Sequence, residues 1–295
     1  MQYHTLGRTG LDVSALGFGG APLGLAYYLA DEDTADPAVE KRHMEAVERA
    51  LALGVTYFDT APGYGDGRSE ALLGRILPKV RDRVVIASKC PHRGKPEGVT
   101  RSVEASLERL GVDCVDVMQF HGSEYSARDA ENILEGGVLD ALERLRDAGK
   151  LRFIGLTAEV PSGALERLLE TGRFDVLQVC YNVCSQLSCD HTRECRGIAA
   201  VAKGQGMGLV SMRTPTSGFL QRLLALEFGA DVATPERVTR LAVNYVLSTR
   251  EIDVALVGMR GAREVELNCA LVDDTAARYD LDALHDRYRD RKGRL

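Results

Sequence analysis

The sequence contains no tryptophan, and aromatic residues make up only 6% of its 295 residues. It also lacks any apolar run long enough to span a membrane, because its longest apolar stretches have the length of strands. The first residues, MQYHTLGRTG, lack the apolar centre of a secretory signal peptide. These absences lead us to expect a cytoplasmic protein that does not enter membranes.

An excess of basic residues is absent as well. The formal net charge is −6 and the isoelectric point is about 5.6, whereas a nucleic-acid-binding domain needs a basic face. Apolar residues at 45% and charged residues at 27% are ordinary for a soluble globular protein with a sizeable core. We therefore expect no nucleic-acid partner and no membrane partner.

The cysteines do not form a recognisable framework. Their number, seven, is odd, and no secretion signal accompanies them, which favours reduced thiols over disulfides. Four of them lie between Cys180 and Cys195, with His191 among them. No pair in this cluster has the two-residue spacing of a zinc knuckle. We expect scattered thiols and no metal site, with a metal site as the less favoured interpretation.

The chain alternates regularly between strand-like and helix-like segments. Residues 2–15 are typical of a hairpin, in which GRTG joins YHTL to LDVSAL. Strand-like segments then follow at 16–20, 55–59, 83–89, 114–120, 152–157, 175–180, 208–212 and 253–257. Helix-like segments follow them at 37–53, 69–78, 97–110, 136–149, 161–171, 193–205, 235–249 and 262–272, with a charged helix at 280–292.

Strict alternation of strands and helices implies a parallel sheet. Eight such units in fewer than 300 residues predict an α/β fold of the closed (β/α)8 TIM-barrel type, preceded by the N-terminal β-hairpin. A doubly wound open sheet is the alternative, but no GxGxxG follows the first strand. Since no linker or low-complexity tract interrupts the pattern, we expect residues 1–295 to form a single domain.

Polar side chains follow three consecutive strand-like segments at their carboxyl ends. The stretch 56–74, TYFDTAPGYGDGRSEALLG, places Asp59 at the end of a strand and Tyr64 on the loop after it. The next two strands end in Lys89 and His121. Each of the four residues alone is more often structural, but together they predict a site at the carboxyl face of a barrel. Lysine beside tyrosine lowers the phenol pKa, aspartate keeps the lysine charged, and a neutral histidine can hold a carbonyl oxygen.

At these residues the sequence resembles the aldo-keto reductase family. LGRTGLDVSALGFGGAPLG, FDTAPGYGDGRSEALLGRIL, VVIASK, VDVMQFH, GKLRFIGLT and VLQVCYN look like the blocks of that family, in its order, from about Leu6 to Asn268. The resemblance implies a nicotinamide cofactor lying across the carboxyl face of the barrel. It also implies a catalytic tetrad of Tyr64, Asp59, Lys89 and His121, with Tyr64 as the general acid.

The resemblance further implies a set of cofactor-binding positions: Gly20, Thr157, Gln178, Arg213, Thr214, Leu220, Gly258, Arg260, Glu264 and Asn268. In this interpretation Gln178 binds the nicotinamide carboxamide, and Arg213 stacks on the ring where the family usually has an aromatic residue. Thr214 and Leu220 fall in the loop over the pyrophosphate, and Asn268 reads the adenine.

The adenosine end departs from the family pattern. Gly258 replaces a common phosphate-binding lysine, and Glu264 replaces a usual arginine. Arg260 and Arg263 lie close to the expected helix start, where they could bind a 2′-phosphate. We therefore expect NADP(H), with NAD(H) as the alternative. Glu159 is also unusual for the family and stands where it could approach the ligand.

The leading functional prediction is an NADP-dependent aldo-keto reductase or alcohol dehydrogenase that acts on CH–OH groups. Its substrate would be a small aldehyde, ketone or sugar, bound among the loops 21–37, 122–135 and 213–230. The FDTAPGYG block resembles the branch that includes sugar dehydrogenases. One alternative is a barrel aldolase that uses Lys89 as a Schiff-base nucleophile. Another is a slow cofactor-binding regulatory or redox-sensing protein. We expect a monomer or a weak homo-oligomer.

Overall fold

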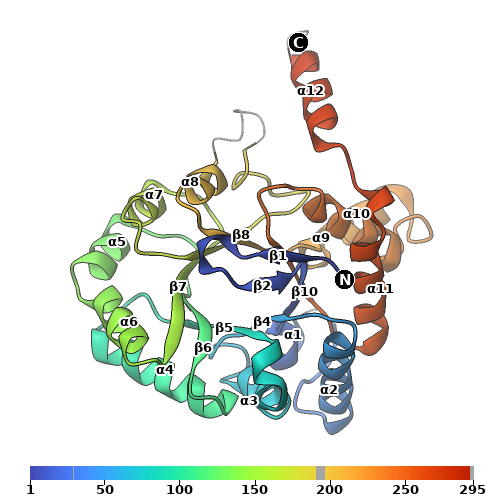
Figure 1. Cartoon of the computed structure of the whole chain (residues 1–295). Coiled ribbons are helices and arrows are strands. Elements are labelled where there is room, and N and C mark those ends of the chain that lie inside the picture. The colour runs from blue at the N-terminus through green and yellow to red at the C-terminus, as the bar shows by residue number, and fades with distance from the viewer. Residues whose placement is uncertain (29, 191–196, 293–295) are drawn as a thin grey trace.

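The computed structural model describes residues 1–28, 30–190 and 197–292, and it is built on a closed barrel of parallel strands (Figure 1). The barrel closes because the last strand pairs with the first in parallel register, with Ala255 opposite Leu16. This confirms the predicted (β/α)8 architecture. Its strands are β3 (Leu16–Gly19), β4 (Tyr57–Asp59), β5 (Val85–Cys90), β6 (Val115–Phe120), β7 (Leu151–Ala158), β8 (Val176–Cys180), β9 (Gly208–Met212) and β10 (Val254–Gly258).

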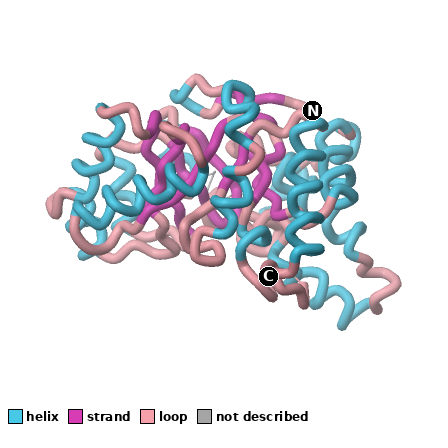
Figure 2. The backbone as a smooth tube through the Cα atoms, turned by 90° about the horizontal axis from the view of Figure 1, so that it is seen from below, coloured by secondary structure: helices cyan, strands magenta, loops and turns pink. Residues whose placement is uncertain are grey.

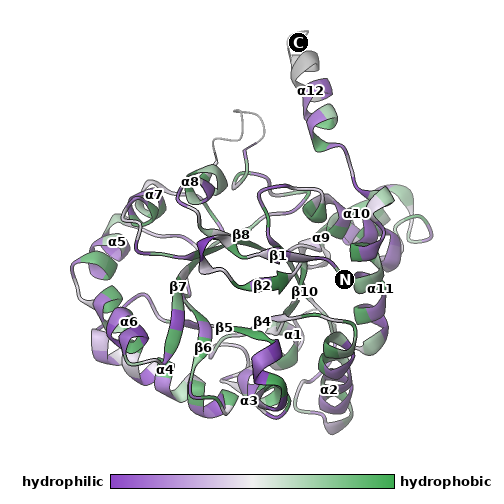
Figure 3. Cartoon of the chain, in the orientation of Figure 1, coloured by the Kyte–Doolittle hydropathy of each residue, from purple (hydrophilic) through white to green (hydrophobic). Residues whose placement is uncertain are grey.

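Helices surround the barrel and bury one face against it. In α4 the buried positions Val99, Val103, Leu107 and Leu110 recur at helical spacing. Green and purple stretches alternate along these outer helices, as expected of elements with one covered face (Figure 3). The ring consists of α2 (Pro37–Ala52), α3 (Arg68–Gly74), α4 (Pro96–Leu110), α6 (Val138–Asp147), α7 (Gly163–Glu170), α8 (Ile198–Gly204), α10 (Pro235–Leu247) and α11 (Ala262–Asp273).

Helix α10 shows why several of these helices begin where they do. Pro235 occupies its first turn, where a missing backbone N–H costs nothing. The side chain of Thr234 accepts a hydrogen bond from the backbone nitrogen of Arg237, as expected of an N-cap. The sequence-based start of this helix is therefore confirmed.

Several boundaries and short elements differ from the prediction. The segment predicted as one helix over 136–149 begins only at Val138, because Gly137 adopts a φ of 79°. The helix predicted over 69–78 ends at Gly74. Part of the predicted helix 193–205 lies outside the described residues. Elements that the prediction left as loops or divided otherwise are α1 (Ala21–Gly24), the 3₁₀ segment Leu77–Arg83, α5 (Ala127–Leu134) and α9 (Phe219–Phe228).

The predicted N-terminal hairpin is present as β1 (Tyr3–Thr5) and β2 (Asp12–Ser14), and it lies across one end of the barrel (Figures 1 and 2). Leu6, Leu11 and Val13 pack on the apolar side chains inside the barrel. Arg8 fastens the hairpin through its guanidinium, which donates to the carbonyls of Gly172 and Phe174, both at 2.7 Å. The hairpin thus covers the amino ends of the strands and leaves the carboxyl ends open.

The C-terminal helix α12 (Leu281–Lys292) projects away from the barrel (Figure 1). Across the described part of the chain, no helix combines the length and the apolar character needed to cross a bilayer.

Candidate active site

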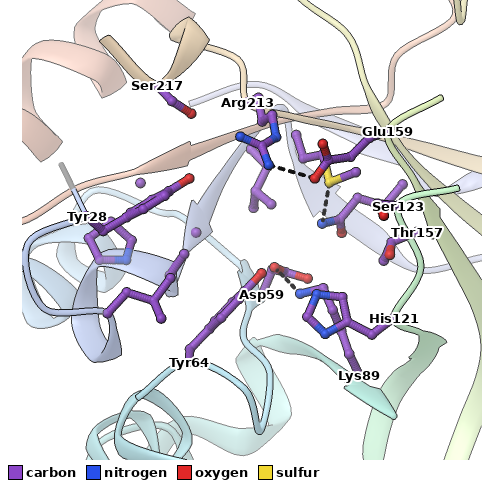
Figure 4. A pocket seen from close by; sticks show the side chains of 18 of the residues that line it. Tyr28, Asp59, Tyr64, Lys89, His121, Ser123, Thr157, Glu159, Arg213 and Ser217 are labelled. Atoms are coloured by element: carbon purple, nitrogen blue, oxygen red, sulfur yellow. Dashed lines mark hydrogen bonds and ion pairs between the residues drawn. The ribbon is translucent and has the colours of Figure 1, made fainter. Parts of the chain in front are cut away.

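The predicted tetrad comes together in one cavity at the carboxyl ends of the strands. Asp59 is the last residue of β4, Lys89 lies near the end of β5, and His121 directly follows β6. These three strands are neighbours in the barrel, and Tyr64 reaches the same cavity from the loop after β4. The cavity has a volume of about 410 Å³. Figure 4 shows the four side chains facing one another inside it.

Lys89 and Asp59 form a buried ion pair at the floor of the site. Lys89 Nζ lies 2.6 Å from Asp59 Oδ1 and 2.7 Å from the carbonyl oxygen of Thr60, and both charged residues are 1% exposed. Burial works to lower the pKa of Lys89, but Asp59 and Tyr64 together raise that pKa above its ordinary value. The lysine therefore keeps its proton at neutral pH. Burial raises the pKa of Asp59 above its ordinary value, and the charge of Lys89 opposes that rise.

Tyr64 lies directly above this lysine, since Lys89 Nζ is 4.9 Å from the centroid of the phenol ring. Burial raises the pKa of Tyr64 above its ordinary value, and the charge of Lys89 opposes that rise without cancelling it. The expectation of a lowered phenol pKa is therefore wrong in its net direction, because burial outweighs the lysine. A phenol with a raised pKa is protonated at neutral pH and can serve as an acid.

His121 is neutral at neutral pH, as the sequence led us to expect. The atoms around its ring desolvate it, and with the nearby charge of Lys89 they lower its pKa to about 4. Its ring meets that of Tyr64 edge to face, with 6.0 Å between the centroids. The backbone carbonyl of His121 also contacts Nδ1 of the buried His92 at 2.9 Å. A neutral imidazole beside the phenol can hold a polar oxygen without competing for its proton.

Gln119 is a site residue that the sequence reasoning missed. Its Nε2 donates to Asp59 Oδ2 at 3.2 Å and to Gln178 Oε1 at 3.3 Å. It therefore joins the tetrad to a predicted cofactor-binding residue. Gln119 lies two positions before His121, so both side chains point to the same side of the strand. The two-residue spacing from His121 is the feature of the sequence that could have identified Gln119.

An ion pair spans the mouth of the cavity. Arg213 donates to Glu159 Oε1 at 2.6 Å, and both side chains line the cavity (Figure 4). Arg213 holds a φ of 56°, a left-handed conformation that is uncommon for a residue with a side chain. Such conformations cluster at functional sites, because the surrounding structure must impose them.

The predicted cofactor-binding residues are distributed over the site and its surroundings. Thr157, Gln178, Arg213 and Gly258 line the central cavity. Gly20, Thr214 and Leu220 do not line it, although Gly19, Ala21 and Pro215 next to them do. Thr214 is fully buried and bonds to Ser211, and Leu220 packs in a small apolar cluster with Ala233 and Val238.

Two of the remaining predicted cofactor-binding residues line a second hollow. Glu264 and Asn268 line a groove of about 310 Å³ between α10 and α11. Asn268 Nδ2 donates to the carbonyl of Glu264 at 2.8 Å, whereas its Oδ1 is buried and has no hydrogen-bond partner in the described chain. An N–H donor that reached this oxygen would satisfy it.

The two arginines expected at the adenosine end are already bound to carboxylates. Arg260 contacts Glu264 Oε1 at 2.6 Å, and Arg263 contacts Glu236 Oε1 at 2.7 Å. Arg260 lies beside a small hollow that adjoins the central cavity at Pro22 and Tyr28. Neither guanidinium can therefore bind a phosphate without giving up its carboxylate partner.

The cysteines give no structural support to a metal site. Within residues 1–28, 30–190 and 197–292, no three His, Cys, Asp or Glu side chains gather in a way that could hold a metal ion. Cys180 and Cys189 are buried, and Cys184 is exposed. His191 and Cys195 of the predicted cluster lie outside the described residues.

Comparison with known proteins agrees with this arrangement. The chain is 31% identical over 299 residues to L-galactose dehydrogenase of Arabidopsis thaliana, an alignment that covers 93% of this chain and 89% of that protein. It is 30% identical to the NADH-specific methylglyoxal reductase of Escherichia coli over 61% of this chain and 56% of that protein.

Solved structures show the same fold. An aldo-keto reductase from Bacillus halodurans in its holo form has a TM-score of 0.76 at 22% identity, covering 98% of this chain and 96% of that one. An aldo/keto reductase from Klebsiella pneumoniae in complex with NADP and acetate has a TM-score of 0.74 at 22% identity, covering 97% and 95%. The model of the aldo/keto reductase family matches residues 15–286. The chain therefore belongs to the aldo/keto reductase family of oxidoreductases.

Proposed function

We propose that this protein transfers a hydride between a nicotinamide cofactor and the carbon of a carbonyl or alcohol group, with Tyr64 as the general acid and base. The observation that carries the proposal is the convergence of Tyr64, Lys89, Asp59 and His121 in one cavity at the open end of the barrel. The family to which the chain belongs supports the same reaction class.

The residues around the site fit a nicotinamide cofactor. The unpartnered Asn268 Oδ1 in the second groove suits an adenine amino group, and Gln178 in the central cavity suits the nicotinamide carboxamide. Arg213 and Gly258 would flank the ligand between these two ends. When bound, the cofactor supplies or accepts the hydride, which no protein side chain can do.

The side chains supply the proton and the orientation. The hydroxyl of Tyr64 donates its proton to the oxygen of a carbonyl substrate, and in the reverse direction it takes that proton back. The ammonium of Lys89 stabilises the phenolate left behind, because the buried pair with Asp59 keeps the lysine charged. The neutral ring of His121 holds the substrate oxygen next to Tyr64.

The mouth of the cavity favours a hydroxylated substrate such as a sugar. Ser123, Ser217 and Tyr28 contribute hydroxyl groups there, and the pair of Glu159 and Arg213 adds charge (Figure 4). Related proteins include D-threo-aldose 1-dehydrogenase of a Pseudomonas species, which is 29% identical over 58% of this chain and 57% of that protein. We infer that the substrate is an aldehyde, ketone or sugar with polar groups near the reacting carbon.

The site does not favour the aldolase alternative. A Schiff-base lysine must be deprotonated to attack a carbonyl. Lys89 is instead held as a cation by Asp59, with its pKa raised, and two acceptors at 2.6 Å and 2.7 Å already bind its ammonium group.

A substrate panel tests the proposal. Purified protein is mixed with aldehydes, ketones and sugars plus NADH or NADPH, and with alcohols and sugars plus NAD or NADP, while the absorbance of the reduced nicotinamide is followed. We expect turnover with at least one carbonyl or sugar, and its loss in a Tyr64→Phe variant. Borohydride trapping of a substrate on Lys89, without any turnover of nicotinamide, would instead establish the aldolase.

A further inference from the structure

The start of α11 contains an anion-binding site that the chain fills with its own carboxylate. The backbone N–H of Arg260 donates to Glu264 Oε2 at 2.8 Å, and its guanidinium donates to Glu264 Oε1 at 2.6 Å. The N-cap residue, Gly261, offers no side-chain cap. Free N–H groups at a helix start and a nearby arginine are what a phosphate group binds. Here Glu264 occupies that position.

The start of α11 adjoins the groove between α10 and α11. Glu264 and Asn268 lie one helical turn apart and line the same groove between α10 and α11. Asn268 is 4% exposed, and its Oδ1 has no partner among residues 1–28, 30–190 and 197–292. A ligand group bound at Asn268 would therefore have Glu264 as its neighbour on the side toward the central cavity.

The order of the residues matches an extended dinucleotide. Gly258 lines the central cavity at the end of β10, Arg260 and Glu264 follow at the start of α11, and Asn268 lies one turn farther along. If Asn268 held the adenine, Glu264 would be the side chain nearest the attached ribose on the side toward Gly258. A negative charge would then face the 2′ position of that ribose.

Two of the neighbouring arginines are paired with carboxylates. Arg263 is paired with Glu236, and its side chain is 81% exposed. Arg240 on the facing helix is paired with Asp274 at 2.8 Å. Arg237 also lines the groove, and its guanidinium donates to the carbonyl of Val232 at 3.4 Å. The sequence-based expectation of NADP(H) relied on Arg260 and Arg263 being available.

We propose that Glu264 makes this enzyme selective for NAD(H). Its carboxylate accepts a hydrogen bond from the 2′-hydroxyl of the adenosine ribose, which is how an acidic residue recognises NAD in other folds. A 2′-phosphate, with nearly two negative charges, is repelled by Glu264. The guanidinium of Arg260 is already paired with that carboxylate. This inference rests on the proposed function and refines its cofactor.

Binding measurements test it without turnover. Dissociation constants for NADH and NADPH are measured by fluorescence titration of the wild type and of Glu264→Gln. We expect the wild type to bind NADH at least about tenfold more tightly than NADPH, which corresponds to about 1.4 kcal/mol. In Glu264→Gln, NADPH should bind at least about tenfold more tightly than in the wild type, while NADH changes by less than about threefold.

Two further variants make the test specific. Glu266→Gln removes the same charge from the same helix, but Glu266 is paired with Arg49 at 2.8 Å and does not line the groove. It should leave the ratio of the two dissociation constants unchanged. Glu264→Gln combined with Arg260→Ala should lose the gain in NADPH affinity, because Arg260 is the cation that Glu264 releases.

The possible outcomes separate this inference from the proposed function. A wild type that binds NADPH more tightly than NADH, or a Glu264→Gln variant with an unchanged ratio, would overturn the role of Glu264 and leave the oxidoreductase intact. Failure to bind either nucleotide in the titration would overturn both. An equal shift in Glu264→Gln and Glu266→Gln would reduce the effect to net charge and also reject the inference.

Discussion

The side-chain amide of Gln119 donates to Asp59 at 3.2 Å across the intervening strand β5. Asp59 is therefore held by two neighbours, Gln119 on one oxygen and Lys89 on the other. This arrangement fixes the carboxylate and, through it, the ammonium group beneath Tyr64. The surroundings of the Tyr64 phenol thus depend on a small polar network at the carboxyl end of the barrel.

The first prediction concerns Tyr64 itself. Tyr64→Phe keeps the ring and its packing but removes the proton donor, so we expect turnover to fall by about 100-fold or more. Cofactor affinity, measured by fluorescence titration, should barely change. Near-native turnover in an assay limited by the chemical step would show that another group moves the proton.

The second prediction concerns the buried ion pair. Lys89→Met leaves the carboxylate of Asp59 buried without its cation, so we expect the free energy of unfolding to fall by about 3–5 kcal/mol. Adding Asp59→Asn removes the unpaired charge and should restore much of that loss. Urea unfolding at neutral pH measures both variants. A double variant as unstable as Lys89→Met would argue that the cost comes from packing.

The third prediction concerns pH. In the unfolded chain a histidine takes up a proton below about pH 6.5, whereas His121 in the folded protein stays neutral down to about pH 4. The unfolded state therefore binds more protons in this window, and the free energy of unfolding falls as the pH drops from 6.5 to 4.

His121→Gln should remove that contribution and flatten the pH dependence. Urea unfolding of both proteins between pH 4.5 and 7 gives the two slopes. The lowered pKa values of His43 and His92 act on both proteins alike, so the difference between the slopes reports His121. Parallel curves would contradict the assignment.

The fourth prediction concerns the ion pair at the mouth. Because Arg213 and Glu159 are both more than a third exposed, Glu159→Gln should change the free energy of unfolding by less than about 1 kcal/mol. The same variant should raise the substrate KM by about threefold or more. Glu135→Gln is the matched control, since Glu135 pairs with Arg167 at 2.8 Å and does not line the cavity. Equal effects of the two variants on KM would remove Glu159 from the substrate site.

The fifth prediction concerns metals. The loose spacing of the cysteines from Cys180 to Cys195 predicts protein without stoichiometric metal and activity that chelators do not alter. Elemental analysis of protein purified without a metal-binding tag measures this. One bound zinc ion per chain would contradict the expectation.

The fold could be predicted from the sequence because the alternation of strands and helices leaves few topologies open. The short elements could not be predicted in this way. Helices α1, α5 and α9 lie in stretches that the prediction treated as loops, and α6 begins two residues later than predicted, after Gly137. Such boundaries depend on local backbone geometry that an apolar pattern does not record.

The site was predictable to the extent that strand ends revealed it. Asp59, Lys89 and His121 could be placed because parallel strands bring their carboxyl ends together. The direction in which the pKa of Tyr64 shifts could not be predicted, because it depends on how deeply the phenol is buried. Nor could the pairing of Arg260 with Glu264, because Arg260 lies before Gly261, the N-cap of α11, where helical spacing does not place its side chain.

The hairpin of β1 and β2 has a consequence for the sequence of events in the reaction. Because Leu6, Leu11 and Val13 seal one end of the barrel, every ligand must enter and leave through the opposite opening. A dinucleotide bound as proposed, from Gln178 to Asn268, would lie across that same opening. Because the nucleotide and the substrate would share one opening, we expect the nucleotide to bind first and to dissociate last.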